Sequence, residues 1–263
     1  CGQLVRSYGP DRLYFNVFCG CDRLLSRAHK SSDPIDVADL NTDQKYQGIR
    51  SQFGGRRAQA NGYRFDFFFQ SEQRIVLASL KRDLAPILDI ACGSGLMVRP
   101  LPTDDILGLD FNQQACVDAR ANGIPIIRGD AFALPLADQT IGQVINCQFL
   151  NQQTSEQTQL FVAEAARVLK PGGRLILTWR HAESLIHKGA AALFEFIDGM
   201  RGCERFPQFT HPMAELESMC TAAGLTVCKK TVTPPIGFLP KLAPDNPISM
   251  LAGASLHMVA DKG

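Results

Sequence analysis

The sequence predicts an α/β fold built on a mostly parallel sheet. Two short apolar runs carry this prediction: Ile87–Ile90 leads into a glycine turn at Gly93-Ser94-Gly95, and Ile106–Leu109 ends in an acid, Asp110. Apolar runs of this length are typical of buried strands, and a glycine turn marks the point where such a strand ends. Helical and strand-like segments alternate along the rest of the chain, which favours the same fold class.

The elements of the N-terminal half follow from local patterns. Apolar residues at helical spacing predict a helix from Ser71 through about Leu84. Asn112 is a suitable N-cap for a second helix, and Asn122-Gly123 is a suitable end for it. We therefore expect a helix over Gln113–Ala121 and strands at Pro86–Ala91, Ile124–Ile127 and Gln143–Cys147.

The elements of the C-terminal half have similar signals. Thr154 and Gln157 form a capping box ahead of a helix that Pro171-Gly172-Gly173 ends. Pro212 marks the start of a later helix, and Gly224 marks its end. The long connection over residues 180–211 is expected to contain a helix at Gly189–Met200. The remaining strands are expected at Arg174–Trp179, Thr226–Thr233 and Ala254–Ala260.

The glycine turn and Asp110 together indicate a nucleoside site. Ligands of open α/β sheets bind at the carboxyl ends of strands, and an acid about 20 residues after a glycine loop is placed to bind ribose hydroxyls. A dinucleotide fingerprint would need a third glycine where Val98 stands, and the prolines of Arg99-Pro100-Leu101-Pro102 stop the next helix within about two turns. The pattern favours adenosine with an amino-acid tail, as in S-adenosylmethionine, over a phosphate-bearing ligand.

At this point the chain resembles the class I S-adenosylmethionine-dependent methyltransferases. The resemblance covers roughly residues 72–260 and has four ordered elements: Asp89–Gly95, Asp110-Phe111, Arg128–Phe132 with Leu134–Asp138, and Arg167–Gly173 with Arg174–Thr178. One departure is Ala91, where many members have glycine; alanine suits that position if its φ is negative.

The resemblance implies a Rossmann-like sheet of seven mostly parallel strands in the order 3-2-1-4-5-7-6, with the last strand antiparallel and helices on both faces. It implies an N-terminal helical or loop lid over residues 1–70, a cofactor-binding domain over 71–263, and a second lid at 180–211. The implied reaction is in-line methyl transfer from S-adenosylmethionine, with S-adenosylhomocysteine as the product. Alignment of donor and acceptor and exclusion of water supply most of the catalysis of such a transfer.

The resemblance also assigns the cofactor residues. The methionine tail is expected to cross the loop of Ala91, Cys92, Gly93 and Gly95. Asp89 is expected to bind the ligand's ammonium, directly or through water, or else to cap the loop's own amides. Asp110 is expected to accept hydrogen bonds from both ribose hydroxyls, since a carboxylate is an acceptor only. The adenine is expected to lie among a small group of residues: Phe111, Asp130, Ala131 and Phe132.

The transfer point is expected at the segment that follows the fourth strand. Asn146 and Gln148 lie there, and their neutral amides suit orientation of an acceptor without a strong base. The segment lacks the order [DN]-P-P-[YF] of the amino-methylating DNA enzymes. An oxygen acceptor needs a general base, and His181 follows the fifth strand closely. The alternative for His181 is an exposed loop histidine.

Composition limits the other classes of function. The net charge of +1 gives no global attraction to nucleic acid, and no apolar run reaches the roughly 18 residues of a membrane span. Nine cysteines include one close pair, Cys19 and Cys21, with no second pair to complete a zinc site, so no metal is expected. Reduced thiols and the absence of a visible signal peptide favour the cytoplasm.

Three functions stay open at this stage. The leading one is a methyltransferase for the oxygen or nitrogen of a small molecule. The second is an RNA or tRNA methyltransferase, which the arginine and aromatic residues before position 70 favour because aromatic rings can stack on bases. The third is a catalytically silent S-adenosylmethionine-binding protein that acts through a partner. The acceptor atom and the oligomeric state have no signal in the sequence.

Overall fold

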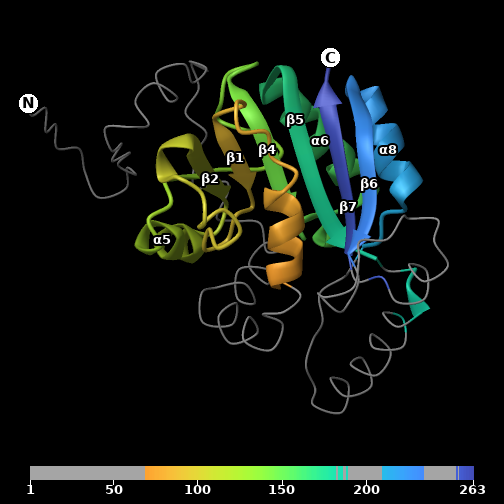
Figure 1. Ribbon diagram of the computed structural model, residues 1–263, viewed down its shortest axis with the longest axis horizontal. Helices are drawn as coiled ribbons and strands as arrows, with labels where there is room; N and C mark the ends of the chain where they lie inside the picture. The colour runs from red at the N-terminus through yellow and green to blue at the C-terminus, as the bar shows by residue number, and fades with distance from the viewer. Residues whose placement is uncertain (1–68, 182, 186–187, 189–208, 234–252, 254) are drawn as a thin grey trace, which may run out of the picture.

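One seven-stranded sheet organises the computed structural model, which describes residues 69–181, 183–185, 188, 209–233, 253 and 255–263 (Figure 1). The strands lie in the order β3-β2-β1-β4-β5-β7-β6. All neighbouring pairs are parallel except those of β7, which is antiparallel to β5 and β6. The predicted fold class and strand order are confirmed. The strands are β1 (Ile87–Ile90), β2 (Ile106–Asp110), β3 (Ile126–Arg128), β4 (Ile141–Cys147), β5 (Leu169–Arg180), β6 (Leu225–Thr233) and β7 (Ser255–Lys262).

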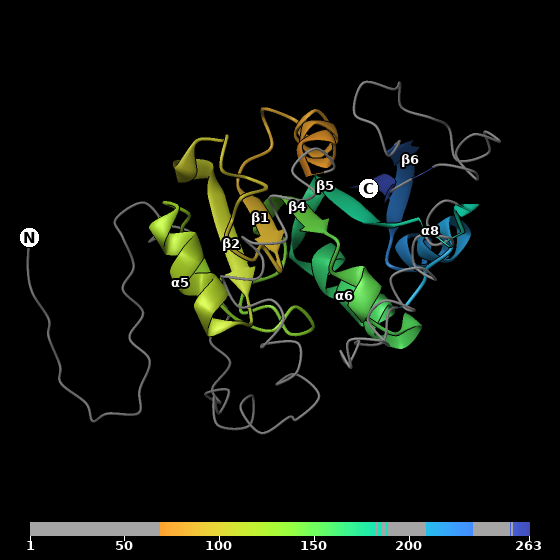
Figure 2. The same ribbon diagram turned by 90° about the horizontal axis from the view of Figure 1, so that it is seen from below.

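Helices cover both faces of the sheet. The helices α6 (Ser155–Val168) and α8 (Met213–Ala222) place Phe161 and Leu216 in one buried core. The helix over residues 69–77 and α5 (Gln113–Ala121) place Val76 and Ala119 in the core of the other face. Figure 2 shows the helix over 69–77 and α6 on opposite sides of the central strands. Short 3-10 turns, η1 (Thr103–Asp105) and η2 (Leu150–Gln152), join the larger elements.

The predicted helix caps are confirmed. The Asn112 side chain accepts hydrogen bonds from the backbone amides of Gln114 and Ala115, at the start of α5. Thr154 and Gln157 form the capping box of α6, with both reciprocal hydrogen bonds present. These signals act within a few residues, so they hold whatever the surrounding fold does.

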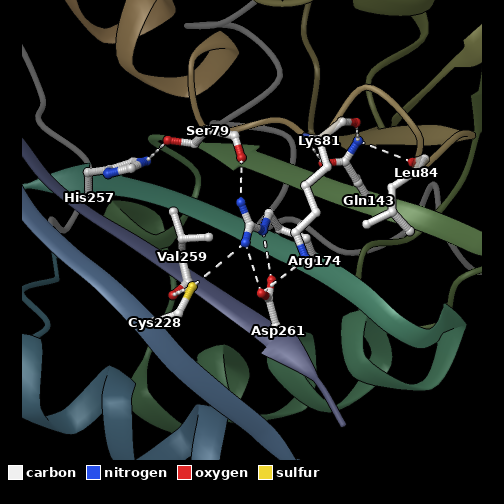
Figure 3. Close-up of polar contacts among 9 residues, drawn as sticks. All are labelled: Ser79, Lys81, Leu84, Gln143, Arg174, Cys228, His257, Val259 and Asp261. Carbon is white, nitrogen blue, oxygen red and sulfur yellow. Dashed lines mark hydrogen bonds and ion pairs between the residues drawn. The ribbon is translucent and has the colours of Figure 1, made fainter.

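The first helix differs from its prediction, because it ends at residue 77 rather than near Leu84. The cause is a buried glutamine of β4 (Figure 3). Gln143 accepts a hydrogen bond from the amide of Lys81 at 2.8 Å and donates to the carbonyls of Lys81 and Leu84 at 2.8 and 3.1 Å. Backbone groups that a longer helix would pair internally are therefore bonded to the sheet.

The same segment is tied to β5 and β7 (Figure 3). The Arg174 guanidinium donates to both carboxylate oxygens of Asp261, at 2.7 and 2.8 Å, and to the carbonyl of Ser79 at 2.9 Å. Lys81 forms an ion pair with Asp261 at 3.2 Å. Ser79 and Thr231 also contact the two ring nitrogens of the buried His257, at 3.4 and 2.8 Å. These contacts fix the chain that connects the helix over 69–77 to β1.

Several other helix and strand boundaries differ from the predicted ones by a few residues. Residues 91–100 form a series of turns, in agreement with the early stop predicted for a helix after the glycine loop. β3 begins at Ile126 rather than Ile124, and β5 begins at Leu169, which pairs with Ile141 across a register shift. The predicted helix at Gly189–Met200 and nearly all of the predicted lid over 1–70 lie outside the described residues. Among the helices described, none is long and apolar enough to cross a membrane.

Candidate functional site

The glycine loop and the end of β2 are joined through Asp110. One carboxylate oxygen of Asp110 accepts a hydrogen bond from the Gly93 amide at 2.8 Å, and the other accepts from the Asn112 amide at 2.8 Å. Burial raises the pKa of this carboxyl, and the backbone hydrogen bonds oppose the rise. Each carboxylate oxygen has a second lone pair, so Asp110 keeps the capacity to accept from hydroxyl groups as predicted.

The glycine loop has two glycines of different character. Gly95 has a φ of +75°, and a Cβ there would lie 2.6 Å from Cγ1 of Ile124, so only glycine fits. Gly93 has a φ of +57°, but a Cβ there would have no described atom within 4 Å. The backbone at Gly93 is therefore open to close approach by a ligand.

The condition under which alanine would suit position 91, a negative φ, is not met. Ala91 has a φ of +56°, in the left-handed region. The turn that follows is held to β2, because the Cys92 amide donates to the Leu109 carbonyl at 3.1 Å and the Gly95 amide donates to the Cys92 carbonyl at 2.9 Å. Holding a non-glycine residue in this region costs about 1–2 kcal/mol, so the loop is strained where many family members have glycine.

Two buried acceptors lie at the ends of neighbouring strands. Asp89 of β1 is 1% exposed, and its Oδ2 has no hydrogen-bond partner among the described residues. Burial, together with a smaller effect of the nearby Asp110, raises the pKa of this carboxyl to about 8. Asn146 of β4 donates to the Ile90 carbonyl at 2.8 Å, while its buried Oδ1 likewise has no partner in the described structure. Buried acceptors of this kind suit a ligand that donates hydrogen bonds.

The predicted adenine residues lie on short turns beyond β2 and β3. The Asp130 carboxylate accepts a hydrogen bond from the Phe132 amide at 2.9 Å, and Ala131 is buried between them. The Arg128 guanidinium lies 5.9 Å from the centre of the Phe111 ring and donates to the Phe111 carbonyl at 3.1 Å. Arg128 therefore holds Phe111 in place through a cation–π contact with its ring and a hydrogen bond to its backbone carbonyl.

The end of β4 is a hydrogen-bonded junction centred on Gln148. This residue has a φ of +62°, and its amide donates to the Thr178 carbonyl of β5 at 2.9 Å. Its side chain donates to Glu72 at 2.5 Å and to Ser255 at 3.2 Å, and accepts from Asn151 at 2.7 Å. The side-chain amide of Gln148 is therefore fixed in position by protein groups.

The predicted histidine, His181, is 2% exposed and lies one residue beyond β5. The alternative of an exposed loop histidine is therefore wrong. A second buried histidine, His211, has a structural environment: its Nε2 lies 3.0–3.2 Å from Thr158 Oγ1 and the carbonyls of Leu150 and Gln153. Its own carbonyl accepts from the indole of Trp179 at 2.7 Å.

Glu72 is the residue at this site that the sequence did not indicate. In the sequence it is one polar residue near the start of a helix, with no motif around it. In the structure it is 8% exposed and hydrogen bonds with Gln148, 76 positions along the chain. Only the tertiary packing of the helix over 69–77 onto the sheet brings these two side chains together.

Comparison with known proteins places this site in a family. A family model described as "Methyltransferase domain" matches residues 88–177, which contain the glycine loop, Asp110, Asp130 and Asn146. This match, the strand order and the ordered motifs together support a class I S-adenosylmethionine-dependent methyltransferase.

The similar proteins differ widely in what they methylate. The chain is 33% identical over 131 residues to the malonyl-[acyl-carrier protein] O-methyltransferase of Methylococcus capsulatus, a match that covers 41% of this chain and 46% of the relative. It is 32% identical over 183 residues to a phthiotriol/phenolphthiotriol dimycocerosates methyltransferase of Mycobacterium ulcerans, covering 66% and 56%. The matches thus span only about half the length of these curated relatives.

A solved structure shows the same fold. It is a protein of Thermotoga maritima described as an S-adenosylmethionine-dependent methyltransferase and possible histamine N-methyltransferase. The TM-score is 0.63 at 19% identity, and the superposition covers 83% of this chain and 98% of that one.

Proposed function

We propose that this protein transfers a methyl group from S-adenosylmethionine to an oxygen or nitrogen atom of a small-molecule acceptor. The observation that carries the proposal is the junction of Asp110 with the open backbone of Gly93, near Asp89, whose Oδ2 has no hydrogen-bond partner among the described residues. A ribose, an amino-acid tail and an ammonium group are the three chemical features that these residues suit.

The residues present fit this cofactor. In the proposal, Asp110 binds the ribose hydroxyls, and Ala91, Cys92, Gly93 and Gly95 form the backbone under the methionine tail. Asp89 binds the ammonium, which would give its buried Oδ2 the donor that the described residues do not provide. The adenine would lie among Phe111, Asp130, Ala131 and Phe132, near the ring that Arg128 supports.

When bound, S-adenosylmethionine supplies a methyl group on a positively charged sulfur that is already a good leaving group. The protein's part is to position the acceptor and to exclude water. We assign positioning to Asn146 and Gln148, since both side chains are held by hydrogen bonds to the protein. His181 is the proposed general base, which would receive the acceptor's proton on an imidazole nitrogen in a buried setting.

One relative supports the acceptor class of the proposal. It is named as a malonyl-[acyl-carrier protein] O-methyltransferase, and that name refers to an oxygen acceptor. The neutral amides at the end of β4 suit either an oxygen or a nitrogen acceptor.

The test has two stages. Calorimetry should show binding of S-adenosylmethionine and no binding of NAD; the opposite result would overturn the cofactor assignment. Transfer of a labelled methyl group should then be measured to malonyl-acyl-carrier protein, a phenol and histamine, with Asp110→Ala as the control whose transfer is reduced at low cofactor concentration. Tight cofactor binding without transfer to any acceptor class, bulk tRNA included, would instead support a silent binding protein.

A further inference from the structure

Glu72 lies where the reacting end of the cofactor is proposed to lie. It belongs to the helix over 69–77, on the face of the sheet whose core contains Val76, and it reaches the junction at the end of β4. The side chain is 8% exposed, and its carboxylate hydrogen bonds with the Gln148 amide at 2.5 Å and with the Thr178 side chain. Burial raises the pKa of this carboxyl, and the two hydrogen bonds oppose the rise. A carboxylate buried to this degree is costly unless a positive charge or several donors accompany it.

The acids of the site form a row along the carboxyl ends of the strands. Asp110 ends β2 and is close enough to Asp89 of β1 to raise the pKa of that carboxyl, after the larger effect of burial. Burial raises the pKa of the Cys147 thiol at the end of β4, and both Glu72 and Asp89 raise it further. Cys147 therefore lies within electrostatic reach of both acids, and Glu72 is hydrogen-bonded to Gln148, the residue that follows β4.

Each acid of this row has a feature of the cofactor to match. Ribose hydroxyls are assigned to Asp110, and the ammonium is assigned to Asp89. The remaining positive charge of S-adenosylmethionine is its sulfonium, whose methyl group must point to the acceptor at the end of β4. Glu72 is the described acid at that end of the row.

We propose that Glu72 faces the sulfonium end of the bound cofactor and makes the site prefer the positively charged methyl donor over the neutral thioether product. The proposal rests on the proposed function. Charge attraction is strong where water is excluded, so the bound donor gains a contact with Glu72 that S-adenosylhomocysteine lacks. Loss of the sulfonium charge on transfer would then weaken the hold on the product and favour its release.

Gln148 is the positioning residue for this carboxylate. Its left-handed backbone and its contacts with Ser255 and Asn151 direct its amide at Glu72. A non-glycine residue in the left-handed region carries a strain of about 1–2 kcal/mol. Strain of this kind persists where the surrounding structure fixes the residue, and it is concentrated at functional sites.

The test is calorimetric and needs no acceptor. Dissociation constants are measured for S-adenosylmethionine, S-adenosylhomocysteine and sinefungin, in which an amine-bearing carbon replaces the charged sulfur. Glu72→Gln should reduce the preference for the two charged ligands over S-adenosylhomocysteine by about tenfold, the scale of one charge-assisted contact. Glu156→Gln, at an exposed site on α6, should leave the preference unchanged.

If Glu72 has only a structural role, Glu72→Gln should weaken the binding of all three ligands by the same factor and leave the preference unchanged. An unchanged preference in Glu72→Gln would therefore overturn the inference. Gln148→Met, which removes the donor to Glu72, should shift the preference in the same direction by a smaller factor, and it decides the matter if Glu72→Gln does not fold. No binding of any of the three ligands by the wild type would instead overturn the proposed function, and this inference with it.

Discussion

The Gly93 amide donates a 2.8 Å hydrogen bond to the Asp110 carboxylate, so the glycine loop and the end of β2 are held together before any ligand binds. The Asn112 amide binds the other oxygen of the same carboxylate, at the start of α5. A single side chain thus links β2, the loop after β1 and the helix that follows. The site is pre-organised for a ligand that spans these three elements.

Asp110→Ala should lower cofactor affinity by about 1–3 kcal/mol, because the ribose hydroxyls lose their acceptor and two backbone amides lose theirs. Calorimetry with S-adenosylmethionine measures the change in affinity. Thermal unfolding of the ligand-free protein measures the loss of stability that follows when the two backbone amides lose their acceptor. The exposed Asp104→Ala is the matched control. Unchanged affinity in Asp110→Ala would show that the ribose is bound elsewhere.

The two loop glycines should separate stability from binding. Gly95→Ala should lower the free energy of unfolding by about 2–4 kcal/mol, because it combines a left-handed backbone with a clash against Ile124. Gly93→Ala has open space around its Cβ, so it should cost only about 1–2 kcal/mol of stability. Its cofactor affinity should nevertheless fall by about tenfold or more, since the added methyl group would meet the methionine tail. Denaturant unfolding and calorimetry test the pair, and full affinity in Gly93→Ala would contradict the path assigned to the tail.

Asp89 should make the ligand-free protein less stable as pH rises. Its pKa is about 8 in the fold, against an ordinary value of 3.8, so over that range the folded chain retains a proton that the unfolded chain releases. Stability from this group is therefore present below pH 3.8 and is lost progressively up to about pH 8. Asp89→Asn removes the effect. Urea unfolding should show the wild type losing stability relative to Asp89→Asn between pH 5 and pH 8, and parallel curves for the two proteins would be inconsistent with a buried, proton-retaining carboxyl.

Gln143→Leu should test the anchoring of the segment before β1. The substitution keeps the volume of the side chain but leaves the Lys81 amide and the carbonyls of Lys81 and Leu84 without their partner. The expected loss is about 2–4 kcal/mol in the free energy of unfolding, measured by urea denaturation. The exposed Gln113→Leu on α5 serves as the control and should change stability by less than about 0.5 kcal/mol.

The sequence predicted those features that depend on neighbours in the chain. Asn112 and the Thr154–Gln157 pair cap their helices because cap geometry involves three or four consecutive residues. The order of the strands could be predicted from the resemblance to the family. The early end of the first helix could not be predicted, because it depends on Gln143 of β4, more than sixty positions away from Lys81.

In the candidate site, too, the features set by neighbours in the chain were predicted and those set by tertiary packing were not. Asp110 and the two glycines were predicted because their spacing is itself the signal. The left-handed backbone of Ala91 and the burial of His181 were not, since both depend on how the loop and β5 pack. Glu72 had no signal at all, because a helix residue becomes part of a site only through the tertiary contact that brings Gln148 to it.

The most direct measurement is a crystal structure of the protein with S-adenosylhomocysteine. The account predicts electron density for the ribose with both hydroxyls in hydrogen-bond distance of Asp110, and for the amino group beside Asp89. It predicts the sulfur at the end of β4, facing Glu72. An adenosyl ligand bound away from the ends of β1, β2 and β4, with the Asp110 carboxylate bonded only to the Gly93 and Asn112 amides, would contradict the account.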